Sequence, residues 1–567
     1  MIDHKQVFRP KLFSLLKDYT KADFMADLMA GIIVGIVALP LAIAFGIAKG
    51  VSPERGIITA IIAGFLISFL GGSKVQIGGP TGAFIVIVYG IIQEYGLDGL
   101  MVATLIAGVL LVLMGVFRLG TVIKFIPYPI IIGFTSGIAV TIFTTQIADI
   151  FGLQFGGEKI PGDFVGKWII YFQHFDSINW GSVMVSVMSV LIIIFTPQFS
   201  KKIPGSLVAI VFITAIVYFI RMYMPELATI ETIGDRFSIQ NSLPDATVPS
   251  LDWEAIQRLI SPAITIALLG AIESLLSATV ADGAIGDKHD SNTELIAQGI
   301  ANIASPIFGG IPATGAIART MTNINNGGRS PVSGIIHAIV LLLILIFLMP
   351  LAQYIPMACL AGVLVMVSYN MSGWRVFSRL LHAPKSDVVV LLITFFLTVL
   401  VDLTVAIELG LIIACLLFIH RVMQTTQISV LTHHLDPNDE TDMETHEEHL
   451  FIPKGVEVYE IDGPFFFGVA TKFEDIMSRM GNRPKVRIIR MRKIPFIDST
   501  GIHNLTSLCE MSKKEQIHII LSGVIPSVQK ELEKAGFYEL LGERNICSNI
   551  NLALQTATDF LAEQTEA

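Results

Sequence analysis

Charged residues and cysteines are scarce in this chain, and each scarcity argues against a class of protein. Only 15% of the 567 residues are charged and 53% are hydrophobic, and the mean hydropathy of +0.69 is far above that of a soluble protein of this size. The four cysteines show no CxxC spacing, which argues against disulfides and against a zinc site. The chain has no GxxxxGK[ST] motif, which argues against ATP-driven transport, and its net charge of −9 does not suggest nucleic acid.

Long hydrophobic runs make up most of the chain. They recur from Phe24 to His420, and a helix needs about 20 apolar residues to cross a bilayer. From about Arg421 the composition is that of a soluble protein. The start of the chain carries five Lys and Arg but no short apolar core with a cleavage site, so we expect it to stay as an arm. The predicted domains are a cytoplasmic N-terminal arm (1–23), a transmembrane domain (24–421), an acidic linker (422–452) and a cytoplasmic domain (453–567).

Turn residues and charges divide the hydrophobic part into fourteen segments. These are residues 24–49, 54–71, 80–93, 98–117, 122–152, 182–198, 204–223, 256–282, 291–308, 317–326, 330–350, 357–371, 386–401 and 404–421. An even number places both termini on one side of the membrane. Lys and Arg collect on that side, whereas the opposite loop, 224–255, is acidic, so the positive-inside rule makes both termini cytoplasmic. We therefore expect a multi-pass protein of the cell inner membrane.

Two of these segments are too short to span the bilayer. Residues 80–93 make about 21 Å of helix against a hydrocarbon core of roughly 30 Å, and residues 317–326 make less. Each follows a stretch rich in Gly and Pro, "KVQIGGP" and "FGGIPATG", and each is third in its set of seven segments. This pattern predicts an inverted repeat in which two broken helices meet at the membrane midplane. The alternative is that Gly and Pro only kink two packed helices.

Several long motifs make the chain similar to a known family. The stretches "GIIVGIVALPLAIAFGIAKG" (31–50), "FIPYPIIIGFTSGIAVTI" (125–142), "GAIESLLSATVADG" (270–283) and "GAIARTMTNINNGGRSPVSG" (315–334) resemble the SulP, or sulfate permease, family of anion transporters. The soluble tail resembles the STAS domain of that family, with "IPFIDSTGIHNL" (494–505) at its signature loop. The resemblance covers nearly the whole chain. It implies an α-helical membrane protein, built as a seven-plus-seven inverted repeat with core and gate domains, followed by a small α/β STAS domain.

The resemblance also implies a substrate site and a homodimer. In the family, the anion lies between the facing ends of the third and tenth helices, which carries over to Pro80, Thr81 and Gly82 and to Ala318, Arg319 and Thr320. Phe45, on the first helix, matches a position that lines the same cavity. Relatives often have glutamine shortly before it, whereas this chain has Leu41, which puts polar contacts from that helix in doubt.

These residues suit an anion on chemical grounds. Two helix N-termini aimed at one point offer unpaired N–H groups and roughly half a positive charge each. Arg319 adds a full charge and a planar fork that fits carboxylate or sulfate oxygens. The alternative for Arg319 is an arginine that snorkels to the membrane surface or pairs with a carboxylate.

Glu273 is the candidate coupling residue. It lies in the middle of the run "ITIALLGAIESLLSATV", with Ser277 one turn away on the same face. A buried carboxylate needs a partner or a proton, so we expect its protonation to change with substrate occupancy. The alternatives are a static Glu273–Arg319 pair and sodium coupling. Relatives with aspartate and threonine at these two places look sodium-coupled, whereas the glutamate and serine of this chain favour protons. Asp402 and Glu408 are further intramembrane acids, for which a solvated or capping role is favoured.

The tail alternates predicted strands with helices near 471–480, 500–513 and 526–535, which suits a small α/β domain. Ser499 matches a serine that accepts phosphate in soluble cousins of the STAS domain, and is a candidate regulatory residue. A helix cap by Asp498 and Ser499 is the favoured alternative. Together the patterns predict a proton-coupled symporter for a small anion, of the sulfate or C4-dicarboxylate class, that needs no cofactor or metal and is not an enzyme. A sodium-coupled bicarbonate symporter and a membrane-anchored anion sensor are the rivals.

Overall fold

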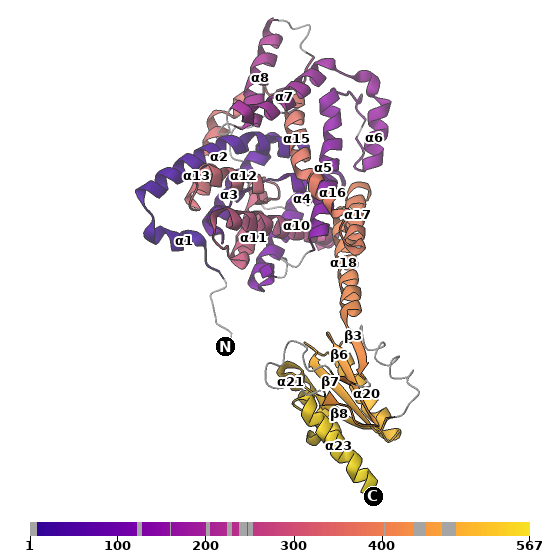
Figure 1. Ribbon diagram of the computed structural model, residues 1–567. Helices are drawn as coiled ribbons and strands as arrows, with labels where there is room; N and C mark the ends of the chain where they lie inside the picture. The colour runs from indigo at the N-terminus through magenta and orange to yellow at the C-terminus, as the bar shows by residue number, and fades with distance from the viewer. Residues whose placement is uncertain are drawn as a thin grey trace. The chain divides into compact units, whose positions relative to one another are not determined.

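The chain folds into two compact units, Met1–Ile413 and Ala414–Ala567. In the computed structural model they are a bundle of helices and a smaller unit around a sheet (Figure 1). The structure describes residues 8–121, 127–158, 160–199, 204–223, 229–237, 246–247, 253–401, 403–431, 434–435, 450–467 and 484–566. Asp402 and the predicted helix at 471–480 lie outside these residues, as does the side chain of Glu408.

A helix lies at each of the fourteen predicted segments. The helices at these segments are α2 (Lys21–Ala48), α3 (Pro53–Leu70), α4 (Ile85–Val116), α5 (Tyr128–Phe151), α7 (Trp180–Phe199), α8 (Gly205–Tyr223), α10 (Trp253–Ile285), α11 (Ser291–Ile307), α12 (Ile317–Asn325), α13 (Val332–Phe347), α15 (Met357–Ser372), α17 (Lys385–Leu400) and α18 (Leu403–Thr425). The helix α4 holds the third and fourth segments, which a left-handed Gly96 (φ 71°) separates. Among the described residues, eight helical stretches are long and apolar enough to cross a membrane.

Other short helices and turns connect these segments. These are α1 (Lys11–Leu15), α6 (Phe164–Gln173), α9 (Ile233–Arg236), α14 (Met349–Ala352) and α16 (Trp374–Leu380), with 3₁₀ turns at η1 (Leu16–Asp18), η2 (Gly82–Phe84), η3 (Leu119–Thr121) and η5 (Phe175–Ser177). The turn η2 leads directly into α4, so the third segment starts as a 3₁₀ turn.

The helix contacts follow the predicted inverted repeat. The first segment (α2) packs on the eleventh (α13). Their equivalents in the other repeat, the eighth segment (α10) and the fourth (within α4), also pack on each other. In the same way, the contact of α3 with α13 has its equivalent in that of α11 with α4. The contact of α7 with α15 has its equivalent in that of α17 with α5. The pairs α3–α11 and α5–α15 join equivalent segments of the two repeats. Such exchange of partners is the contact pattern of two repeats related by a pseudo-twofold axis. The predicted fold class, a helical membrane domain followed by a small α/β domain, is confirmed, whereas the number of fourteen membrane spans stays a prediction.

Two groups of helices result from these contacts. The core group contains α2, α3, α4, α10, α11, α12 and α13, and the gate group contains α5, α7, α8, α15 and α17, each packing chiefly within itself. Glycines allow the closest approach in the core, between α4 and α11. A Cβ on Gly299 would lie 2.6 Å from the carbonyl oxygen of Gly108, so neither position accepts a side chain without moving a backbone.

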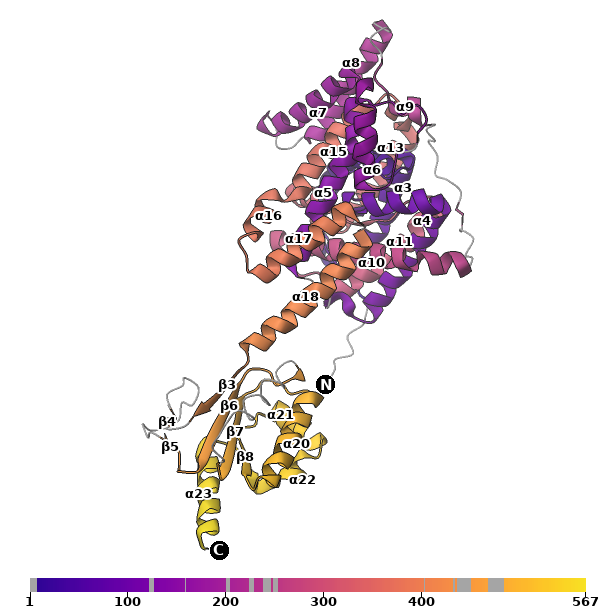
Figure 2. The ribbon, with the colours of Figure 1, turned by 90° about the vertical axis from the view of Figure 1, so that its right-hand side faces the viewer.

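The second unit is a five-stranded sheet covered on both faces. Its order is β3 (Gln427–Leu431), β6 (Val456–Asp462), β7 (Val486–Lys493), β8 (His518–Ser522) and β9 (Ile546–Cys547), with β3 antiparallel and the others parallel. The helices α20 (Ser499–Lys514), α21 (Pro526–Lys534) and α22 (Phe537–Leu541) lie on one face, and α23 (Ile550–Glu566) lies on the other (Figure 2). Successive side chains of a strand point to opposite faces of the sheet. Ile489 packs with Leu505 of α20, whereas Ile488 packs with Ala553 of α23.

The predicted linker, residues 422–452, carries regular structure where it is described. It contains the end of α18, the edge strand β3, and the pair β4 (His434–Leu435) and β5 (Leu450–Phe451). The 3₁₀ turn η7 (Glu543–Asn545) completes the elements of the second unit.

Candidate functional site

The two broken helices meet at a short antiparallel bridge. Strand β1 (Gly78–Gly79) pairs with β2 (Thr314–Gly315), and α4 and α12 begin just beyond these strands. The N-cap residues Thr81 and Ala316 are extended, and neither side chain caps its helix. The first N–H groups of both helices are therefore left without a side-chain cap at this meeting point.

The glycines of this bridge are required by close approach. At Gly79, whose φ is +148°, a Cβ would lie 2.2 Å from Nη1 of Arg319. A Cβ on Gly315 would lie 1.5 Å from Nε2 of Gln76. These contacts explain why the two apolar segments are interrupted by "GGP" and "ATG", since the backbone must pass directly beside buried polar side chains.

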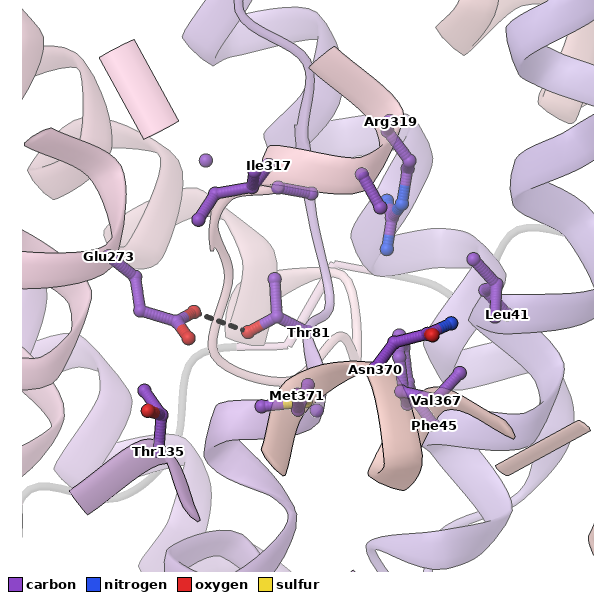
Figure 3. A pocket seen from close by; sticks show the side chains of 14 residues that line it. Leu41, Phe45, Thr81, Thr135, Glu273, Ile317, Arg319, Val367, Asn370 and Met371 are labelled. Carbon is purple, nitrogen blue, oxygen red and sulfur yellow. Dashed lines mark hydrogen bonds between the residues drawn. The ribbon is translucent and has the colours of Figure 1, made fainter. Parts of the chain in front are cut away.

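A cavity of about 410 Å³ lies at this meeting point (Figure 3). Its wall is formed by the starts of two helices, one carboxylate, one guanidinium and residues of the gate group. The lining residues are Leu41, Phe45, Thr81, Gly82, Thr135, Glu273, Gly315, Ala316, Ile317, Ala318, Arg319, Val367, Asn370 and Met371. The volume lies in the usual range for small-molecule sites. Since α2, α10 and α12 belong to the core group and α5 and α15 to the gate group, the cavity lies between the two groups.

Arg319 is held by backbone carbonyl groups. It is the third residue of α12, is 2% exposed, and donates from Nη2 to the carbonyl oxygen of Pro80 and from Nη1 to that of Gly78, at 3.4 Å. Among the described residues, no carboxylate lies within 4.0 Å of its guanidinium. Its charge therefore faces the cavity without an ion-pair partner, beside the N-terminus of its own helix.

Glu273 reaches the cavity from α10. Its Oε2 accepts a hydrogen bond of 2.9 Å from Oγ1 of Thr81, and Figure 3 shows the two side chains directed toward each other. Glu273 and Arg319 both line the cavity, but they bind different partners, so the static pair considered from the sequence is not formed.

Ser277 and Thr320 lie behind the cavity rather than in its wall. The two hydroxyl oxygens are 3.3 Å apart, and Oγ1 of Thr320 also accepts from the N–H of Ile77 at 3.0 Å. Both residues are buried. They connect α10, α12 and the segment before β1. Of the predicted residues, the structure thus brings Phe45, Thr81, Gly82, Glu273, Ala318 and Arg319 to the cavity wall, with Pro80 contributing its carbonyl.

Three polar or soft residues of the cavity wall and one buried lysine were not predicted from the sequence. Thr135 of α5 and Asn370 and Met371 of α15 line it from the gate group. Asn370 could have been predicted, because it is a strongly polar residue near the end of the apolar run 357–371. Lys49, at the C-cap of α2, is fully buried four residues after Phe45, although a lysine at the end of an apolar run indicates a flanking charge.

In the second unit, Asp498 is the N-cap of α20. Its Oδ1 accepts from the N–H of Gly501 at 2.8 Å, and its Oδ2 accepts from that of Phe467 at 3.2 Å. Ser499 is exposed in the first turn, and its hydroxyl makes no hydrogen bond to a described residue. The aspartate alone therefore acts as the cap.

We expect Asp498→Ala to destabilise α20 by about 1 kcal/mol, a roughly fivefold loss of amide protection, because the cap is lost. Ser499→Ala is the matched control and should change protection by less than about 0.5 kcal/mol and leave transport unchanged. Hydrogen exchange of residues 499–514 in the full-length protein measures the first effect. A large fall in transport for Ser499→Ala would instead support a phosphorylation role.

Comparison with known proteins agrees with the motifs. Residues 24–394 match the model of the Sulfate permease family, and residues 450–556 match that of the STAS domain. A protein of Bacillus subtilis named "Putative sulfate transporter YvdB" is 41% identical over 499 residues, which is 87% of this chain and 90% of that protein. The "Bicarbonate transporter BicA" of Picosynechococcus is 31% identical over 503 residues, which is 86% of each chain.

Two solved structures are similar to the fold. The transmembrane domain of a cyanobacterial bicarbonate transporter, BicA, has a TM-score of 0.61 and 30% identity, covering 70% of this chain and 98% of that one. The inward-facing murine anion transporter Slc26a9 has a TM-score of 0.85 at 19% identity, covering 96% and 93%, and supports the fold alone.

Proposed function

Because the chain belongs to the sulfate permease family of anion transporters, and is a transporter rather than an enzyme, we propose that it carries a small anion into the cell with a proton. The observation that carries this proposal is the convergence of two uncapped helix N-termini and the guanidinium of Arg319 on one cavity. These groups supply N–H donors and positive charge, and no carboxylate of the described part of the chain pairs with Arg319.

Sulfate and C4-dicarboxylates are the proposed substrates. Relatives named as sulfate transporters support sulfate, and a cavity of about 410 Å³ also leaves room for a four-carbon dicarboxylate. Leu41, Phe45 and Val367 make part of the wall apolar, which suits a carbon backbone better than a fully hydrated ion.

Alternating access is supported by the origin of the cavity wall. Core residues such as Arg319 and Glu273 face gate residues such as Thr135 and Asn370 across the cavity. A rocking motion of one group against the other would open the site to each side in turn while the anion stays on the core.

Proton coupling is favoured over sodium coupling by the directions of the polar side chains. A cation site needs several oxygen atoms that converge on one point. Glu273 is directed to Thr81, whereas Ser277 is directed to Thr320 on the far side of the wall. A sodium-coupled bicarbonate symporter is the second candidate, which the similarity to BicA favours.

We also propose that both termini are cytoplasmic, that the protein lies in the cell inner membrane as a homodimer, and that the STAS domain regulates transport or dimerisation. On the side of the N-terminal arm, Lys11 and Lys74 lie 3.3 and 3.0 Å from Asp287. Basic residues at this end agree with the positive-inside rule.

The test is uptake by the purified full-length protein in proteoliposomes, with labelled sulfate, succinate, fumarate and bicarbonate measured in parallel. We expect sulfate or a dicarboxylate to accumulate faster when the outside is acidified, without sodium. Sodium-dependent uptake of bicarbonate alone would establish the second candidate. Anion binding without flux would support a membrane-anchored sensor that signals through its STAS domain.

A further inference from the structure

The described part of the N-terminal arm, residues 8–20, is held against the core group. The N–H group of Arg9 donates to Oγ1 of Thr293 at 3.1 Å, at the start of α11. The N–H group of Lys11 donates to the carbonyl oxygen of Gly71 at 2.9 Å, just after the end of α3. Figure 1 shows α1 folded back from the start of α2 toward α11. The arm therefore has one side against the core group and one side turned away from it.

The outward side of the arm is apolar. Leu12 is buried, whereas Phe13 and Leu16, which are one turn apart, are 53% and 48% exposed. The ring of Phe13 lies edge-on against that of Phe69, with 5.7 Å between the centroids. Phe69 in turn stacks on Phe65, with 5.6 Å between the centroids. Three aromatic rings thus form a continuous row from the arm onto α3.

This row of rings continues a surface that lies in the membrane. The helix α3 is long and apolar enough to cross the bilayer, and Phe65 and Phe69 lie one turn apart in its last two turns. Phe65 is 38% exposed, and an exposed apolar side chain on a membrane-spanning helix faces lipid. On α2, whose first turns follow the arm, Phe24 and Met25 are exposed as well. The arm therefore lies at the membrane surface, with its apolar side continuous with the lipid-facing side of α3.

Basic side chains accompany the apolar ones. Residues 8–23 contain four basic residues and two acidic ones. One of the acids, Asp23, pairs with Arg329 at 2.9 Å, whereas Lys17 and Lys21 are exposed and make no ion pair with a described residue. Lysines beside an apolar face at a membrane surface attract anionic lipid headgroups. The charge of the arm therefore complements an anionic membrane.

We infer that the N-terminal arm is an interfacial anchor for anionic phospholipids. Phe13 and Leu16 enter the boundary between headgroups and acyl chains, and the two exposed lysines bind the phosphate groups of the same lipids. A protein partner is disfavoured, because the row of rings that begins at Phe13 ends on the lipid-facing Phe65. The anchor ties the core group to the membrane surface at the end of α3, from which the chain runs to β1 and the cavity. This role goes beyond transport and depends neither on the anion nor on the coupling ion.

The first test measures where the arm lies. In the full-length protein with Cys415→Ser, the substitution Leu16→Cys supplies an exposed cysteine for a nitroxide spin label, since the other three cysteines are buried. The protein is reconstituted in vesicles of phosphatidylcholine and phosphatidylglycerol. We expect the label to lose its access to a water-soluble nickel chelate and to keep its access to oxygen, which concentrates in the bilayer. Ser14→Cys is the matched control, because Ser14 is an exposed polar residue of the same helix, and its label should remain accessible to nickel.

Two results of this test would overturn the inference. Equal access of nickel to both labels would place the arm in water. Loss of access to both oxygen and nickel at Leu16→Cys would instead place a protein on the arm, either the second unit of the chain or a second copy.

The second test measures the choice of headgroup next to the arm. A fluorophore on Leu16→Cys is quenched by brominated phosphatidylglycerol or by brominated phosphatidylcholine, and the ratio gives the relative affinity of the two lipids. Phosphatidylglycerol should be preferred, and Lys17→Gln/Lys21→Gln should lower the preference by about fivefold. Lys513→Gln/Lys514→Gln removes the same charge from exposed positions at the end of α20 and is the matched control.

An unchanged preference in the arm variant, or an equal loss in the control, would overturn the anchor. Neither test requires transport, so both decide the anchor separately from the proposed function.

Discussion

Replacing Arg319 by alanine is expected to weaken sulfate binding by about 10- to 100-fold while the protein stays folded. A charge-assisted hydrogen bond contributes about 1.5 to 3 kcal/mol, and 1.4 kcal/mol is a factor of ten in affinity. The residue is 2% exposed, but its partners are carbonyl oxygens of the bridging segment rather than a carboxylate. No unpaired buried charge is therefore left behind by the substitution, and the loss falls mainly on the ligand.

Titration calorimetry of the purified protein with sulfate, and with succinate if sulfate does not bind, measures this effect. Arg319→Lys should recover part of the affinity, because it keeps the charge but loses the planar fork. Arg329→Ala is the matched control, since Arg329 pairs with Asp23 at 2.9 Å and is 62% exposed at its side chain. Normal transport with an unchanged KM in Arg319→Ala would show that Arg319 is structural and that the site is misplaced.

The second large effect is expected from Glu273→Gln, which should abolish the response of uptake to a proton gradient. Glutamine resembles the protonated acid, and its Oε1 can still accept the hydrogen bond of 2.9 Å from Thr81. The geometry of the cavity is therefore retained while the proton-binding group is removed. We expect anion binding and exchange to persist and accumulation driven by the gradient to be lost.

Uptake into proteoliposomes with an internal pH of about 7.5 and an external pH stepped across roughly 5 to 8 makes the comparison. The wild type should accelerate as the outside is acidified, because protonation of the site precedes movement of the loaded core, and the variant should be flat. Ser277→Ala separates the two coupling ions, since Ser277 lies against Thr320 and not in the cavity. A wild type that ignores pH but requires sodium, with both residues needed, would replace proton coupling by sodium coupling.

The broken helices were predictable because their sequence signal is local. Short apolar length beside Gly and Pro indicates a half-helix, and the structure shows why glycine is required at Gly79 and Gly315, where the backbone passes beside Arg319 and Gln76. The place of Arg319 in the cavity wall was predictable as well, since it stands at the start of the second half-helix.

The rest of the site depends on contacts between distant segments. Asn370 and Thr135 reach the cavity because α15 packs on α5 and both face the core, which no spacing within either helix reveals. Glu273 and Ser277 are one turn apart on α10, yet they have different partners. Glu273 contacts Thr81, just before α4, whereas Ser277 contacts Thr320 of α12, so these two segments lie against successive turns of α10. Lys49 was missed because a lysine after an apolar run normally marks the membrane surface.

The bridge between β1 and β2 has a consequence for biosynthesis. Arg319 and the carbonyl group of Pro80 that it binds are 239 positions apart in the chain, and a ribosome adds about 5 to 20 residues per second. The first half-helix thus waits roughly 10 to 50 s in the membrane before the second repeat supplies its partner strand. During that interval the N–H groups of Gly78 and Gly79 and the free end of α4 must be satisfied by water, the insertion machinery or another chain, so the nascent first repeat is the stage most open to misassembly and to a chaperone.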